Sequence, residues 1–101
     1  MYARVATLKT GAEGIEASIR YFREVALPGI RAMSGFQGAT LLINRDDHLA
    51  QSTTYWDTPG HLQALEEPAQ AIQEALMDPI EGVEVVSVES YEVAVDETAV
   101  G

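Results

Sequence analysis

The sequence predicts an α+β domain whose elements follow the order β-α-β-β-α-β. Three observations lead to this prediction. Two short β-type runs flank a polar break between residues 39 and 56, which is the pattern of a β-hairpin. One stretch of helical apolar periodicity precedes this hairpin and another follows it. Further β-type runs at residues 2–8 and 83–95 place a strand before the first helix and another after the second.

The first helix is expected at residues 15–33, where apolar side chains recur every three or four positions after the strand at residues 2–8. Pro28-Gly29 lies inside this pattern without changing its phase. A proline inside a helix removes one backbone hydrogen bond and clashes with the preceding turn, so we predict a kink or an irregular last turn. Ser34-Gly35 is expected to end the helix.

The hairpin is expected to join strands at residues 39–43 and 49–56 through a turn at residues 44–47. The first of these strands is apolar on both faces, with Leu42 alone on its second face. In the second strand, alternation gives one face to His48, Ala50, Ser52, Thr54 and Trp56. The small side chains in this row leave room either for a cavity or for a closely packed helix, and a cavity with a few polar groups is the default binding site.

The second helix is expected to begin at Thr58-Pro59, because threonine caps a helix and proline suits its first position. Its apolar stripe runs past Pro68 to Leu76 without changing phase, and Asp78-Pro79 ends it.

In the last β region, residues 83–95, the apolar positions change parity. A regular strand cannot do this, so a bulge or a break near residues 87–90 is predicted. We expect a single domain at residues 1–96 and a loose tail at residues 97–101.

This order of elements is the ferredoxin-like arrangement, with a four-stranded antiparallel sheet and both helices on one face. The helices can cover only that face, yet Leu42, either Val83 or Val86 and one row of the first strand place apolar groups on the other. We expect no other part of the chain to cover them. An exposed apolar sheet face is an association surface, and a two-fold axis is the simplest way to cover it. We therefore predict a homodimer in which sheet packs against sheet.

Composition and charge exclude several classes of protein. The 101 residues contain no cysteine, which excludes disulfides and thiolate chemistry. All six basic residues lie within the first 45 positions, and the net charge of −10 disfavours binding to nucleic acid through its phosphates. No apolar stretch approaches the ~20 residues of a membrane span, and no signal-like segment opens the sequence. We expect a cytoplasmic protein without nucleic-acid or membrane partners.

Three stretches resemble the antibiotic biosynthesis monooxygenase domain of the dimeric α/β-barrel superfamily. Residues 28–39 (PGIRAMSGFQGA) look like its passage from the first helix into the second strand. Residues 54–64 (TYWDTPGHLQA) look like its strand-three tryptophan and second helix, and residues 88–93 (VESYEV) are similar to its closing strand. The resemblance implies a dimeric α/β barrel and, in some catalytic members, oxidation of aromatic substrates without cofactor or metal.

The resemblance also implies catalytic residues, most of which this sequence lacks. Haem-degrading members carry an Asn on the first strand, the strand-three Trp, and a His late in or after the second helix; only the Trp is present, as Trp56. Quinone-forming members use Asn and Trp with other polar partners, and Asn44 in the hairpin turn is a poor substitute. An enzyme of this type would be a cofactor-free monooxygenase, and a non-catalytic protein is the alternative.

The candidate substrate-binding residues are Trp56, Phe22, Tyr21, Ser52 and Arg31. Trp56 is expected either to stack on a flat substrate or to be a core residue at a strand end. The aromatic residues of the first helix are expected to be pocket walls or interface residues. Arg31, like Arg4, could anchor an anionic substrate group, or could be solvated or paired across the dimer.

His61 is the candidate catalytic residue, because an imidazole titrates near neutrality and can act as a general base. The alternative is an exposed polar residue in the first turn of the helix. His48, beside Asp47, is expected to serve the hairpin turn. The two histidines lack a short fixed spacing, so no metal site is expected.

The leading hypothesis is a dimer that binds a small apolar or aromatic molecule between sheet and helices and oxidises it with dioxygen without a cofactor. In that case His61 or a buried water would be the base. The alternative hypothesis is a non-catalytic ligand-binding or stress-response dimer, and the third hypothesis is a haem-degrading enzyme.

Overall fold

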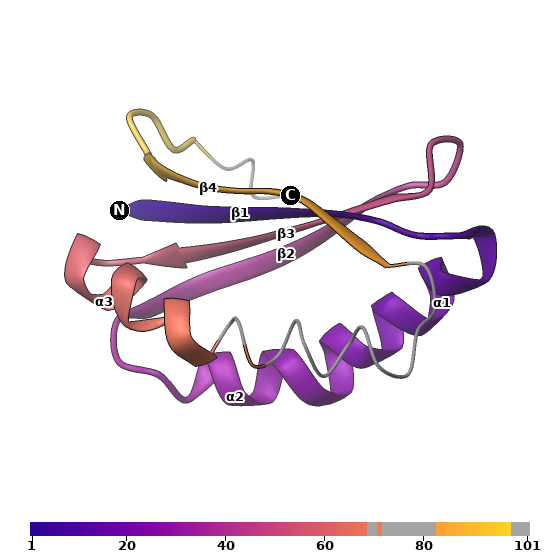
Figure 1. The fold of residues 1–101 in the computed structure, drawn as a ribbon. Coiled ribbons are helices and arrows are strands. Elements are labelled where there is room, and N and C mark those ends of the chain that lie inside the picture. Colours follow the sequence, from indigo (N-terminus) through magenta and orange to yellow (C-terminus); the bar gives the residue numbers. More distant parts are fainter. Residues whose placement is uncertain (69–70, 72–82, 98–101) are drawn as a thin grey trace.

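The computed structural model describes residues 1–68, 71 and 83–97. Four strands form one antiparallel sheet in the order β2-β3-β1-β4. These strands are β1 (Tyr2–Lys9), β2 (Phe36–Asn44), β3 (Leu49–Trp56) and β4 (Glu84–Glu92). The helical segments α1 (Ala12–Tyr21), α2 (Leu27–Arg31) and α3 (Pro59–Ala64) lie on one side of the sheet (Figure 1). The predicted ferredoxin-like α+β architecture is confirmed.

The first helix is interrupted before its proline. Between α1 and α2, the segment η1 (Phe22–Ala26) forms a π-helical turn, and the Leu27 N–H donates to the Phe22 carbonyl five residues back. Pro28 follows directly, and in a regular α-helix its ring would clash with the carbonyl of Glu24. The wider turn relieves that clash. The predicted irregularity is confirmed, although it precedes Pro28 and does not form the last turn.

The predicted bulge in β4 is also confirmed. Thr7 pairs with Ser87 but Leu8 pairs with Val85, so Val86 is the extra residue on β4. The bulge therefore lies one residue before the predicted range. It keeps Val85 and Val88 on the helical side of the sheet, opposite Leu8 and Ala6, despite the change of parity in the sequence.

The best-buried part of the core lies under α2 and α3. Trp56 is completely buried, and its ring meets Phe36 edge to face with centroids 5.8 Å apart. The fully buried members of this cluster are Ala26, Ile30, Trp56, Leu62 and Leu65. Thr58 caps α3 as predicted, because its Oγ1 accepts a hydrogen bond from the His61 N–H at 3.1 Å. The predicted continuation of this helix beyond Pro68 lies outside the described residues, apart from residue 71.

The opposite face of the sheet is largely open. Leu42 is 56% exposed there, and Tyr91 is similarly exposed. Val83, in contrast, is buried on the helical side against Leu8, Ala17 and Tyr21. The expectation that no part of the chain covers the open face is wrong at one end. Residues 93–97 turn back over it (Figure 1), and Asp96 lines a surface hollow with Thr40 and Tyr55.

Candidate functional site

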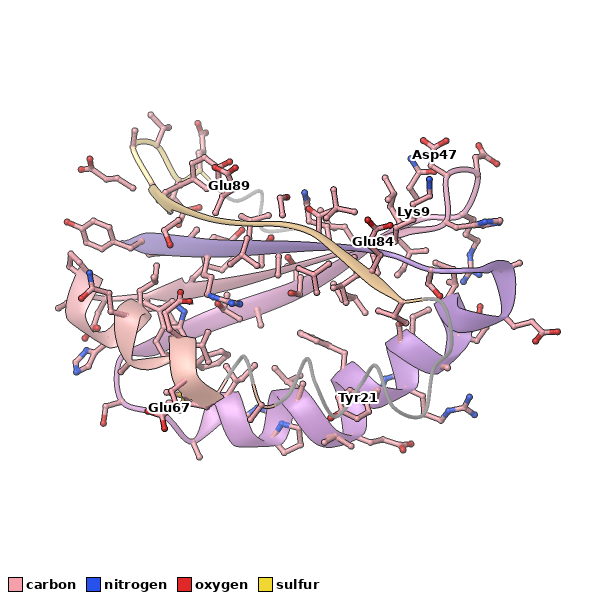
Figure 2. All side chains as sticks on the ribbon, in the orientation of Figure 1. Lys9, Tyr21, Asp47, Glu67, Glu84 and Glu89 are labelled. Carbon is pink, nitrogen blue, oxygen red and sulfur yellow. The ribbon has the colours of Figure 1, made fainter. Side chains whose placement is uncertain are left out.

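A cavity of about 70 Å³ lies between the sheet and the helical layer. Its floor includes small side chains on neighbouring strands, with Ala6 on β1 paired to Ser52 on β3 and Ala50 on β3 paired to Leu8. Tyr21 and Phe22 line it from the helical layer. The side chains that fill the space between the two layers are drawn in Figure 2. A volume of this size holds more than one water molecule.

Five polar side chains line this cavity: Arg4, Ser18, Tyr21, Ser52 and Thr54. Arg4, in the middle of β1, is only 7% exposed, and its Nε donates to Glu66 Oε1 at 3.2 Å. Thr54 pairs with Arg4 across the strands, and its Oγ1 accepts a hydrogen bond from Trp56 Nε1 at 2.9 Å. Ser18, on α1, is 5% exposed, and its hydroxyl has no hydrogen-bond partner among the described residues. The remaining lining is mainly apolar.

The structure gathers three of the five candidate substrate-binding residues around this cavity: Tyr21, Phe22 and Ser52. Trp56 does not line the cavity; it lies at the end of the same row of β3, in the core under α2 and α3, and donates a hydrogen bond to Thr54, which does line it. Arg31 is exposed at the end of α2 and does not line the cavity either. Of the two arginines considered as anion anchors, only Arg4 faces the cavity.

His61 lies away from the cavity, in the first turn of α3. Its Nδ1 is 2.6 Å from Asp57 Oδ1, and its side chain is partly exposed. The hydrogen bond from His61 holds the pKa of the Asp57 carboxyl below its usual value of 3.8. Both side chains pack against Gly35, where φ is +82° and an added Cβ would overlap them. The pair therefore ties the start of α3 to the connection that leads into β2.

His48 belongs to the hairpin turn. Its φ of 55° is left-handed, and its carbonyl accepts a hydrogen bond from the Thr10 N–H at 3.0 Å. Within the described residues, no three His, Cys, Asp or Glu side chains are grouped so that they could hold a metal ion. No helix in the described part of the chain is long and apolar enough to cross a lipid bilayer.

Sequence reasoning missed Ser18, although a signal was available. Ser18 lies three residues after Ile15 and four before Phe22, so it occupies a position in the apolar stripe of the first helix. A polar residue in phase with such a stripe faces the core, where its hydroxyl needs a partner. Arg4 gave a comparable signal, because it shares a face of β1 with Ala6 and Leu8.

No family model matches this sequence. Two uncharacterized proteins of Mycobacterium tuberculosis strains, MT2634 and Rv2557, are each 29% identical to it over 94 residues, or 93% of this chain. The match covers 41% of each of those proteins, so the chain spans less than half the length of these relatives.

Several solved structures share the fold. A protein of Deinococcus radiodurans, described as a proposed antibiotic biosynthesis monooxygenase, has a TM-score of 0.76 at 18% identity, with full coverage of both chains. The haem degrader MhuD of Mycobacterium tuberculosis has a TM-score of 0.71 at 19% identity and covers 97% of this chain and 100% of its own. SnoaB, a cofactor-independent oxygenase of Streptomyces nogalater, has a TM-score of 0.67 at 16% identity, with 94% of both chains covered.

A dimeric ferredoxin-like protein from an uncultured marine organism is similar as well, with a TM-score of 0.69 at 12% identity over 98% of this chain and 92% of its own. At these identities the likeness concerns architecture. The chain therefore has the ferredoxin-like fold of the antibiotic biosynthesis monooxygenase-type proteins.

Proposed function

We propose that this chain binds a small, largely apolar or aromatic molecule between its sheet and its helices, and oxidises it with dioxygen without a cofactor. The observation that carries the proposal is the cavity itself. The small side chains of Ala6, Ala50 and Ser52 leave space between the sheet and the helices, and polar groups face into that space. SnoaB, which shares the fold, is a cofactor-independent oxygenase.

The described cavity fits only part of an aromatic ligand. Its volume of about 70 Å³ is roughly half of the ~150 Å³ that encloses a benzene molecule. An aromatic ring therefore extends through the cavity mouth or displaces a side chain of the helical layer. Tyr21 and Phe22, which line the cavity from the helical layer, are both only partly buried.

In such a reaction the substrate supplies all the electrons. A CH₂ group next to a carbonyl loses a proton and reacts with O₂, and the products are a new C=O group and one molecule of water. The protein must accept the proton, hold the substrate and limit access of bulk water. Because His61 does not line the cavity, the proton acceptor in this proposal is a water molecule held between Ser52 and Thr54, for which the cavity has room.

The test is oxygen consumption with a panel of anthrones and quinols, combined with a variant that fills the cavity. Ala50 is 1% exposed and lines the floor, so Ala50→Leu is expected to abolish both binding and turnover. Ala64→Leu, at an exposed position of α3, is the matched control and should behave as the wild type. His61→Ala should also retain activity. Equal turnover by the Ala50→Leu variant would refute the cavity as the site.

A non-catalytic ligand-binding protein is the second candidate. It is favoured by one observation: no His, Asp or Glu is among the described side chains that line the cavity. The two candidates separate cleanly, because a binding protein would take up the same ligands without consuming oxygen. Addition of haem is a third measurement in this experiment. A shift of the Soret band of haem would support the hypothesis of haem degradation instead.

The open face of the sheet supports a further part of the proposal, which is that two copies pack sheet against sheet. The central row of this face, on β1 and β3, carries no charged side chain from Ala3 to Thr7 or from Gln51 to Tyr55. Leu42 and Tyr91 extend the apolar part of this face onto the outer strands, and on β4 the Tyr91 hydroxyl donates a hydrogen bond to the Glu89 carboxylate beside it. A second copy presents an identical surface and fits it by two-fold symmetry. The similar marine protein is described as dimeric.

A further inference from the structure

The hydroxyl of Ser18 is the least satisfied polar group in the described core. The residue is 5% exposed, lines the cavity, and has no hydrogen-bond partner for its Oγ. A serine inside a helix usually bonds to the carbonyl four residues earlier or points to solvent, and this one does neither. A buried hydroxyl without a partner lowers stability, so it indicates that a group able to bond to it enters the cavity.

Arg4 is the only permanently charged side chain among the described cavity-lining residues. Its hydrogen bond to Glu66 uses Nε alone, whereas a guanidinium has four further N–H donors on its terminal nitrogens. Glu66 itself is 54% exposed and lies outside the lining, so solvent screens much of its charge. The cavity therefore meets a guanidinium whose charge is only partly compensated.

We propose that Arg4 and Ser18 form a subsite for an anionic oxygen, so that the ligand is an apolar molecule that carries one phenolate or enolate group. The charged group of the ligand accepts hydrogen bonds from the Arg4 guanidinium and from the Ser18 hydroxyl, while its apolar body lies over Ala6 and Ala50. This subsite rests on the proposed function, and it makes the chain selective for molecules that ionise readily.

The experiment uses 4-nitrophenol, whose phenolate form absorbs in the visible, and nitrobenzene as a neutral probe of similar shape. The wild type is expected to lower the apparent pKa of bound 4-nitrophenol by about one unit, which is a tenfold preference for the anion. Arg4→Gln should remove this shift, and Arg4→Lys should retain part of it. Glu66→Gln should increase the shift, because it removes the carboxylate that competes for the guanidinium.

Ser18→Ala separates the hydroxyl from the charge. It is expected to weaken binding of 4-nitrophenolate several-fold while leaving binding of nitrobenzene unchanged. If nitrobenzene binds but the pKa of 4-nitrophenol does not move, the subsite is refuted and the cavity remains a ligand site. If neither probe binds, the proposed function fails together with the subsite. Circular dichroism of each variant establishes that it is folded, and Glu66→Gln, at an exposed residue, tests the subsite even if Arg4→Gln unfolds.

Discussion

At the scale of single residues, the most conspicuous side chains of the sequence are not the ones that line the cavity. Trp56 and His61 are rare residues that invite a functional role, yet Trp56 is fully buried and His61 bonds to Asp57 at the surface. Arg4 and Ser18, which are less conspicuous, line the cavity. Alternation along β1 places Arg4 on the same face as Ala6 and Leu8, but only the packed structure shows that a cavity remains between this face and the helices.

The Asp57–His61 pair gives a prediction about pH. Because the hydrogen bond from His61 lowers the pKa of Asp57 in the folded state, the carboxylate stabilises the fold above its unfolded pKa. That contribution is lost as the pH falls through the lowered folded value, in the range below about pH 4. Carboxyl ¹³C NMR titration should find Asp57 below 3.8 in the wild type and nearer to 3.8 in His61→Ala. His48→Ala, in the hairpin turn, is the control; an unchanged Asp57 titration in His61→Ala would contradict the assignment.

At the scale of elements, most boundaries follow from the sequence. The hairpin strands, the Thr58 cap and the stripe of the first helix were predictable from β-branched runs, capping chemistry and helical period. The exact place of the irregularities was not. The clash caused by Pro28 can be relieved by a kink or by a π-helical turn. Which of the two forms depends on how Phe22 and Ala26 pack against the sheet, and the apolar periodicity of the sequence does not contain that information.

Gly35 gives the prediction at this scale, because it connects α2 to β2. Its φ of +82° disfavours other residues, and a Cβ there would overlap the Asp57–His61 pair. Gly35→Ala is expected to lower the free energy of unfolding by about 1–3 kcal/mol in urea denaturation. Gly29→Ala is the matched control, because Gly29 is helical with nothing within 4 Å of an added Cβ, and it should stabilise by roughly 0.5–1 kcal/mol. Equal effects of the two substitutions would show that the connection relaxes freely.

At the scale of the whole molecule, one sheet has one helical layer. Figure 2 shows Glu89 on the open side and Tyr21 on the helical side, which agrees with the pairing of Glu89 with Val5. The sequence predicted this asymmetry. The β-α-β-β-α-β order places both helices on one face of the sheet, while apolar side chains are expected on both faces. The sequence did not predict that residues 93–97 return over one end of the open face, since the alternation of Val93 and Val95 favoured a strand up to residue 95, whereas β4 ends at Glu92.

The proposed dimer gives the prediction at this scale. Leu42→Glu places a charge on the outer strand β2 of the open face, at a side chain that is 56% exposed, and the variant should sediment as a monomer where the wild type sediments as a dimer at micromolar concentration. Val25→Glu is the matched control: Val25 is 52% exposed on the helical side, so its variant should remain dimeric. Both positions are already exposed, so neither change disturbs the protomer core. A monomeric wild type would overturn the proposal.

The π-helical turn also bears on how chains of this shape can differ in length. A turn of this kind holds one residue more than the α-helical turn that it replaces. A sequence lacking one residue between Phe22 and Ala26 could therefore run as a single uninterrupted helix while Ile15 and Ile30 both still faced the sheet. Because Phe22 and Ala26 line the cavity, an insertion or deletion at this one place would change the size of the cavity while the sheet kept its register.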